Sequence, residues 1–339
     1  MVAHVPVLLV AGFLGAGKTT LLNHVLRHPS GARIGVVVND FGKVNIDAML
    51  VAGQVDAMVS LGNGCVCCVV DTDDLDRVLH RLAAVRPALD SIVIEASGLA
   101  EPRALIRMVL GARSERIRYG GLVYVVDAVE FDDTCDTHPE LARHARLADL
   151  VVINKADRVG SDELSDLIAR VRALAGPVPV LPTAHGRVDP AMLFDVSGKR
   201  TSQAGAQLSL DELMRETGCE THEHLHDRYQ SVEFSTDVPL DPRKLMAFLE
   251  HPPAGLFRAK GIVGFAADIH RKHVVHTVGR HVSFTATRWR RGEQARTQLV
   301  FIGIGLDSAD VLARLRATEH DEDQPPDPHA MLRVDALTR

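Results

Sequence analysis

Apolar and polar positions alternate in blocks along the first half of the chain. Short, almost wholly apolar runs rich in valine and isoleucine are separated by stretches whose apolar residues have helical spacing. Such runs are typical of strands covered on both faces of a sheet. The predicted strands are Val5–Val10, Ile34–Val38, Ser91–Ile94, Leu122–Val126, Val151–Ile153 and Val178–Leu181, and helices are predicted over Thr72–Ala84 and Leu141–Ala148, among others. This alternation indicates an α/β fold with a doubly wound, mostly parallel sheet.

The second half follows a different pattern. Residues 198–227 are polar and irregular, which is typical of a linker, so we expect a first domain over residues 1–197. Strands and helices resume in residues 228–317 and predict a smaller α+β domain. Its predicted elements are the strands Ser231–Ser235, Phe257–Phe265, His273–Val278, Ser283–Thr287 and Gln298–Ile304 and the helices Pro242–Glu250 and Ser308–Ala317. Residues 318–339 are acidic and contain prolines, so we expect a disordered tail.

Composition narrows the class of protein. Of the 339 residues, 46% are hydrophobic and 24% charged, which is a normal balance for a globular chain able to bury cores. The net charge of −6 argues against a nucleic-acid partner, because phosphate binding requires a basic face. The sequence contains no apolar run long enough to span a bilayer, so no membrane partner is expected. We therefore expect a soluble cytoplasmic protein.

A glycine-rich loop follows the first predicted strand. Residues 12–20 read Gly-Phe-Leu-Gly-Ala-Gly-Lys-Thr-Thr and fit the P-loop pattern G-x-x-x-x-G-K-[ST], with a helical stretch directly after it. Backbone amides of such a loop surround the nucleotide phosphates, Lys18 neutralises them, and the Thr19 hydroxyl ligates Mg²⁺. The expected nucleotide-binding residues here are Gly12, Gly15, Ala16, Gly17, Lys18, Thr19 and Thr20.

A second motif selects the base. Asn154, Lys155 and Asp157 form N-K-x-D at the end of a predicted strand. The Asp157 carboxylate can accept hydrogen bonds from both N1–H and the exocyclic amine of guanine, a pair that adenine does not offer. Thr183 and Ala184, after the next strand, lie where a backbone amide could meet the guanine O6. The predicted nucleotide is therefore GTP, with GDP as product.

Two strand ends supply candidate switch residues. Glu95 and Gly98 follow the strand Ser91–Ile94, where an acid near Mg²⁺ and a glycine amide on the γ-phosphate are expected; the alternative is an acid that caps a turn. The predicted catalytic set is Lys18, Thr19, Glu95 and Gly98, with Thr19 and Glu95 on Mg²⁺. Asp40 follows the second strand and could approach Mg²⁺, the attacking water or another metal, and the sequence does not choose among these.

Three of the five cysteines lie within four residues. Cys65, Cys67 and Cys68 follow a glycine-flanked lead-in, and three thiolates at this density suit zinc or another soft ion. Buried inert cysteines and a redox pair are the alternatives. The alternating His222, His224 and His226 could bind metal loosely or form a solvated part of the linker.

Taken in order, these motifs resemble those of the CobW-type GTPases. The likeness rests on the P-loop, the run Asn-Asp-Phe-Gly at 39–42, the Cys-x-Cys-Cys motif, the run from Glu95 to Pro102, N-K-x-D, and the C-terminal stretches 257–261 and 299–303. It implies a P-loop GTPase sheet with a CobW-type C-terminal domain, GTP, GDP and Mg²⁺ binding, zinc on the three cysteines, and slow GTP hydrolysis. Relatives commonly have glutamate where this chain has Asp40, which puts the role of that carboxylate in doubt.

The function that this resemblance implies is a GTP-dependent metallochaperone. GTP binding and hydrolysis would change the zinc affinity of the cysteine loop and allow transfer of zinc to an unidentified client metalloprotein. A homo-oligomer is a further possible assembly. A cobalt-handling protein of cobalamin synthesis and an activator of a metalloenzyme such as nitrile hydratase are alternatives within the resemblance. A passive metal store, a P-loop kinase and a thiol redox protein are alternatives outside it.

Overall fold

The computed structural model describes residues 4–27, 32–38, 57–60, 72–98, 100–194, 229–289, 293–321 and 323–338. The chain divides into two compact units. The first runs to Gly176 and resumes at Leu181, and the second takes Pro177–Val180 and the residues from Tyr229 onward. In the described part of the chain, none of the helices has the length and apolar character that crossing a membrane requires.

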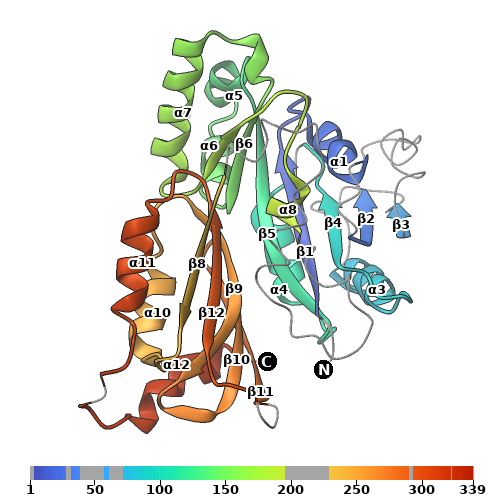
Figure 1. Cartoon of the computed structure of the whole chain (residues 1–339). Coiled ribbons are helices and arrows are strands. Elements are labelled where there is room, and N and C mark those ends of the chain that lie inside the picture. Colours follow the sequence, from blue (N-terminus) through green and yellow to red (C-terminus); the bar gives the residue numbers. More distant parts are fainter. Residues whose placement is uncertain are drawn as a thin grey trace. The chain divides into compact units, whose positions relative to one another are not determined.

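The first unit is an α/β sandwich built on a seven-stranded sheet in the order β3-β2-β4-β1-β5-β6-β7 (Figure 1). Its strands are β1 (Val5–Gly12), β2 (Ile34–Val38), β3 (Ala57–Ser60), β4 (Ser91–Glu95), β5 (Ile117–Asp127), β6 (Leu150–Asn154) and β7 (Val180–Pro182). Its helices are α1 (Lys18–Arg27), α3 (Thr72–Ala83), α4 (Pro102–Leu110), α5 (Phe131–Thr137), α6 (Glu140–Ala145), α7 (Ser161–Ala175) and α8 (Pro190–Leu193), with a 3-10 turn η1 (Ala156–Arg158).

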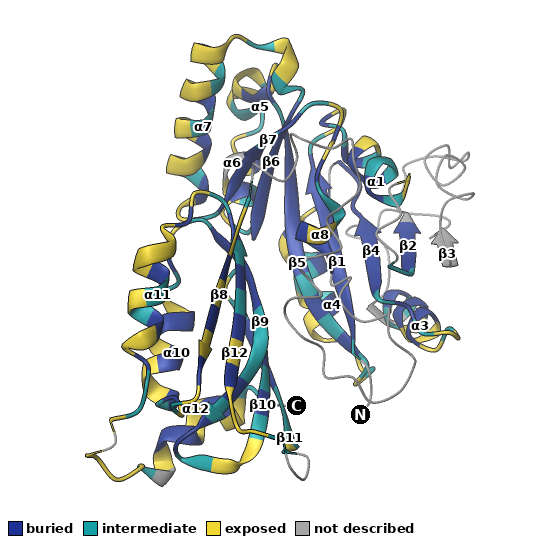
Figure 2. Cartoon of the chain, in the orientation of Figure 1, coloured by how far each residue is buried: buried dark blue, intermediate teal, exposed yellow. Residues whose placement is uncertain are grey.

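Central strands of this sheet are buried throughout, as their apolar sequences predict. Every residue of β1, β4 and β6 is buried, and Figure 2 shows these strands in dark blue. The pairings β1–β4, β1–β5, β2–β4, β2–β3 and β5–β6 are all parallel, which confirms the predicted doubly wound, mostly parallel sheet. Because β1 lies between β4 and β5, chain connections leave it in both directions, and ligands of such sheets bind at the carboxyl ends of the strands there.

The second unit is a five-stranded antiparallel sheet in the order β11-β10-β9-β12-β8. Its strands are β8 (Gln230–Thr236), β9 (Leu256–Phe265), β10 (Asp268–Val278), β11 (His281–Arg288) and β12 (Thr297–Gly303), and its helices are α10 (Pro242–Glu250), α11 (Ser308–Arg316) and α12 (Leu332–Ala336), with a 3-10 turn η3 (Pro328–Met331). Val232 and Phe234 alternate with exposed residues along β8, and they join residues of all three helices in one core. The predicted α+β class is thus observed.

The C-terminal residues differ from the expected disordered tail. Met331 and Val334 are 5% and 0% exposed and belong to the core of the second unit. Asp327 accepts a hydrogen bond from the backbone N–H of His329 and so caps η3. The acidic and proline-rich composition therefore marks a capped turn that leads into a short helix, because two apolar side chains have a core to enter.

Candidate functional site: a nucleotide pocket at the carboxyl edge of the sheet

The loop between β1 and α1 has the backbone form of a phosphate-binding loop. Gly12 and Gly17 have φ of +148° and +99°, values that side chains other than glycine rarely adopt. A β-carbon at Gly12 would lie 2.2 Å from the carbonyl oxygen of Val125 on β5, and one at Gly17 would lie 2.1 Å from Nδ2 of Asn154. Both glycines therefore allow the loop to pass close to neighbouring strands.

Lys18 and Thr19 begin helix α1 directly after this loop. The Lys18 ammonium donates a 3.0 Å hydrogen bond to the Phe13 carbonyl, which holds the cation across the loop. The Thr19 hydroxyl donates a 2.6 Å hydrogen bond to Oε1 of Glu95 at the end of β4. Glu95 is 3% exposed and pairs in register with Val10 of β1, so the parallel sheet brings the two motifs together across 76 residues.

Asn154 joins the phosphate-binding loop to the loop after β7. Its Nδ2 donates to the Ala16 carbonyl at 3.0 Å, and its Oδ1 accepts from the Gly186 backbone N–H at 2.9 Å. At 2% exposure, the side chain is buried between the two loops. Asn154 therefore fixes the spacing of three motifs rather than only one, a role that the sequence analysis missed.

The predicted base-reading residues follow Asn154 directly along the chain. Lys155 has the left-handed backbone conformation, with φ of 60°, and its ammonium is ion-paired with Asp127 at the end of β5. Asp157 lies in η1, partly exposed, and its Oδ2 is 4.0 Å from Nε2 of His185. The Ala156 backbone N–H donates to the Thr183 carbonyl, which ties the two base-side loops together. Sequence analysis did not single out His185, although it follows Thr183 and Ala184 directly.

Gly98 packs on the phosphate-binding loop. A β-carbon at this position would lie 2.7 Å from the backbone nitrogen of Leu14 and 2.6 Å from its Cδ2. Only glycine fits against Leu14 there. The predicted sensor glycine is therefore in direct contact with the loop that receives the phosphates.

These contacts form a site whose groups suit the binding of a nucleoside triphosphate. A buried lysine supplies positive charge, and the hydroxyl of Thr19 and the carboxylate of Glu95 are the hard oxygen donors that Mg²⁺ prefers. The donor set therefore fits Mg²⁺. Asp157 offers the paired acceptor that guanine requires.

The predicted zinc residues Cys65, Cys67 and Cys68 lie outside the described residues, as do Asp40 and the histidines 222, 224 and 226. Within the described ranges, no cluster of three histidine, cysteine or carboxylate side chains could hold a metal ion. Cys135 of α5 is a free thiol. Burial, followed by the charges of Asp132 and Asp136, raises its pKa.

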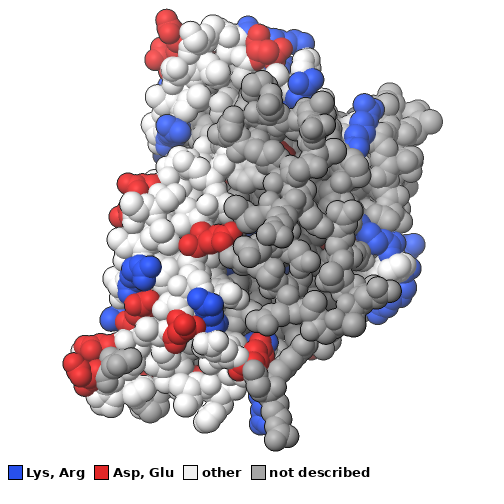
Figure 3. All heavy atoms as spheres, viewed as in Figure 1, with Lys and Arg blue, Asp and Glu red and all other residues white. Residues whose placement is uncertain are grey.

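Figure 3 shows one face of the molecule. On it, the described lysines and arginines and the described aspartates and glutamates lie in several separate groups.

Two family descriptions match the chain. Residues 6–182 match the family described as CobW/HypB/UreG, nucleotide-binding domain, and residues 229–319 match the cobalamin synthesis protein cobW C-terminal domain. The boundaries of these matches fall close to the two structural units.

Similar curated proteins span nearly the whole chain. The zinc chaperone YjiA of Escherichia coli is 29% identical over 322 residues, covering 91% of this chain and 97% of the relative. The zinc chaperone CobW of Sinorhizobium sp is 30% identical over 351 residues, with coverages of 92% and 97%. The zinc chaperone CobW of Pseudomonas aeruginosa is 32% identical over 370 residues, with coverages of 93% and 91%. Matched across both of its units, this chain belongs to the CobW family.

Proposed function

We propose that this protein is a GTP-hydrolysing zinc chaperone that delivers zinc to a client metalloprotein. The observation that carries the proposal is the joined nucleotide site, in which Asn154, Thr19 and Glu95 connect four separate motifs, in a chain about as long as relatives named zinc chaperones. Zinc is the cargo, and Cys65, Cys67 and Cys68 are its proposed ligands.

GTP binds along the carboxyl edge of the first sheet. The amides of residues 12–17 and the Lys18 ammonium hold the phosphates, and the Asp157 carboxylate accepts from the guanine N1–H and amine. Bound Mg²⁺ supplies charge stabilisation for the phosphates as the bond to the γ-phosphate breaks. Thr19 and Glu95 are the proposed residues that hold it, with Glu95 acting directly or through water.

Hydrolysis uses water and yields GDP and inorganic phosphate. Gly98 packs on Leu14 of the phosphate-binding loop, and it is the proposed sensor of the γ-phosphate. Glu95 and Gly98 precede α4, whereas the cysteines lie between β3 and α3, so the switch and the zinc loop belong to neighbouring segments of the chain. Loss of the γ-phosphate then changes the zinc affinity, and the client receives the ion.

Zinc binding by cysteine variants tests this function. The zinc dissociation constant of the full chain is measured by competition with a chromophoric chelator. We expect the variant Cys65→Ser/Cys67→Ser/Cys68→Ser to lose tight zinc binding and to keep GTP binding. Cys135→Ser is the matched control, since Cys135 lies on α5, and it should bind zinc as the wild type does. Tight zinc binding by the triple variant would remove the proposed cargo site.

A further inference from the structure

A tight turn after β7 has His185 at its exposed tip. The Arg187 backbone N–H donates to the Ala184 carbonyl at 3.1 Å, which closes the turn around His185 and Gly186. Both central residues have positive φ, 54° for His185 and 64° for Gly186. Turns with two such residues favour glycine, asparagine or aspartate at the first central position, so a histidine there costs free energy. A costly backbone conformation at a surface position is an indication that the side chain has a function.

The backbone of this turn is fixed from two directions. The Gly186 backbone N–H donates to Oδ1 of the buried Asn154 at 2.9 Å. A β-carbon at Gly186 would lie 2.6 Å from the backbone nitrogen of Leu21, so the turn also packs closely on α1. The His185 side chain, in contrast, is 66% exposed. The turn therefore holds the imidazole of His185 in solvent from a well-supported backbone.

His185 lies beside the carboxylate that is assigned to guanine. Its Nε2 is 4.0 Å from Oδ2 of Asp157. This distance is too long for a hydrogen bond, so the two groups do not satisfy each other. The negative charge of the carboxylate favours the neutral imidazole tautomer that carries its proton on Nε2. A donor and an acceptor therefore stand side by side, and the Asp157 side chain is 42% exposed, so both groups are accessible to a ligand.

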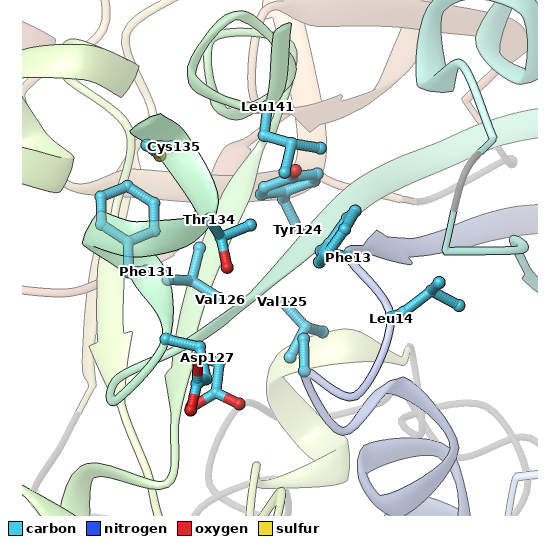
Figure 4. Close-up of a pocket in the computed structure, with 12 residues that line it drawn as sticks. Phe13, Leu14, Tyr124, Val125, Val126, Asp127, Phe131, Thr134, Cys135 and Leu141 are labelled. Atoms are coloured by element: carbon cyan, nitrogen blue, oxygen red, sulfur yellow. The ribbon is translucent and has the colours of Figure 1, made fainter. Parts of the chain in front are cut away.

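The neighbouring cation of the same motif is already paired. The Lys155 ammonium forms an ion pair with Asp127, which lies at the end of β5 (Figure 4). The His185 ring makes no hydrogen bond to any residue that the structure describes. Of these two side chains, His185 is therefore the one whose donor is available to a base that binds at Asp157.

Guanine presents the acceptor O6 directly beside the donor N1–H, whereas adenine has an amine in place of O6. From the adjacent donor of His185 and acceptor of Asp157, we propose that the His185 ring N–H donates to the guanine O6 while Asp157 accepts from N1–H. Opposite adenine, the same N–H would meet a second donor and remain unpaired, which weakens binding. His185 is thus a specificity-determining residue. This inference rests on the proposed function for GTP as the nucleotide, and it adds a second side chain that reads the base.

The test compares GTP with 6-thioguanosine triphosphate, in which sulfur, a weak acceptor, replaces O6. Competition against a fluorescent GDP analogue gives the dissociation constants of the full-length protein for both nucleotides. The wild type should prefer GTP. His185→Phe keeps a ring and removes the donor, so this preference should fall about five-fold, as expected for one net hydrogen bond. His185→Gln keeps a donor without the ring and should retain most of the preference.

Controls separate this contact from other effects. His80→Phe, on the exposed side of α3, is the matched control and should leave the preference unchanged. Inosine triphosphate lacks the exocyclic amine but keeps O6, so His185→Phe should weaken its binding by the same factor as that of GTP. Thermal unfolding shows whether each variant is folded. If His185→Phe is not, His185→Asn takes its place, because asparagine tolerates positive φ and its amide extends less far from the backbone.

A wild-type protein that does not distinguish the two nucleotides overturns the inference, and so does an unchanged preference in His185→Phe. Loss of the preference in His185→Gln as well as in His185→Phe also overturns it, since the ring rather than the donor then matters. If any of these results is obtained while GTP still binds more tightly than ATP and zinc still binds, the proposed function stands. Equal affinity of the wild type for ATP and GTP would instead overturn the guanine assignment and the proposed function with it.

Discussion

The Thr19 hydroxyl donates a 2.6 Å hydrogen bond to the buried carboxylate of Glu95, and so joins the phosphate-binding loop to the end of the neighbouring strand. Both oxygens are hard donors of the kind that Mg²⁺ prefers, so Thr19 and Glu95 are the residues that would hold this ion. Glu95 stands where many GTPases have aspartate. The longer side chain reaches Thr19 from within the sheet.

Glu95→Gln should impair hydrolysis more than folding. The amide can still accept from Thr19, but it lacks the charge that favours Mg²⁺. We expect a fall of at least about ten-fold in the GTP hydrolysis rate, equivalent to about 1.4 kcal/mol in the barrier, and a higher Mg²⁺ requirement. A magnesium titration of the hydrolysis rate measures both. Glu115→Gln, an exposed carboxylate, is the control; an unchanged magnesium requirement in Glu95→Gln would remove Glu95 from the magnesium site.

Asp157→Asn should change the base preference. An amide presents a donor where guanine also has a donor, and xanthine has a carbonyl oxygen at the corresponding position. GTP affinity should fall about ten-fold or more, and xanthosine triphosphate should become the better ligand. Competition binding with the two nucleotides measures the switch, with Asp166→Asn on α7 as control. Retained GTP preference would contradict the base-reading role.

Met331→Ala should destabilise the second unit although it lies in the stretch that composition marks as a tail. Met331 is 5% exposed, whereas its neighbour Leu332 is 66% exposed. Truncation of a buried methionine to alanine lowers the free energy of unfolding by about 2–5 kcal/mol. Truncation of an exposed leucine changes it by no more than about 0.5 kcal/mol. Denaturant unfolding followed by the fluorescence of Trp289, the one tryptophan in the sequence, reports on this unit. Equal effects of Met331→Ala and Leu332→Ala would show that residues 328–336 do not pack.

The buried His273 should make the stability of the second unit depend on pH. Burial at 0% exposure holds the imidazole pKa below its ordinary 6.5, against the opposing effect of Asp268, 3.0 Å from Nε2. The folded state takes up the proton less readily than the unfolded state. The contribution of neutral His273 to the free energy of unfolding is therefore complete above about pH 6.5 and is lost as the pH falls below it. The free energy of unfolding, measured at pH 7.5 and 5.5, should fall more in the wild type than in His273→Gln. Equal losses would contradict this assignment.

Local patterns predicted much of the fold. Ile34–Val38 and Pro242–Glu250 are observed with the predicted bounds, because a continuous apolar run and a capped amphipathic helix carry their signal within a few residues. β3 was missed, since its four residues carry little signal. Residues 328–336 were misassigned because burial there depends on a core formed by distant strands.

Some residues of the candidate site could be predicted from local motifs, and others could not. The P-loop glycines, Lys18 and Thr19 follow from a contiguous motif. The role of Asn154 in linking two loops could not be predicted in this way. Its hydrogen-bond partners Ala16 and Gly186 are 138 and 32 residues away, and only the folded sheet brings them together. His185 became visible only through its approach to Asp157.

The central claim is that the nucleotide and zinc sites are coupled, and the zinc dissociation constant in two nucleotide states tests it most directly. The full-length protein is loaded with Mg²⁺ and either GDP or a non-hydrolysable GTP analogue, and zinc is titrated against a competing chelator. The account predicts zinc dissociation constants that differ by about five-fold or more between the two states, and the same ratio must appear in the nucleotide affinities with and without zinc. Identical zinc dissociation constants in both states would contradict it.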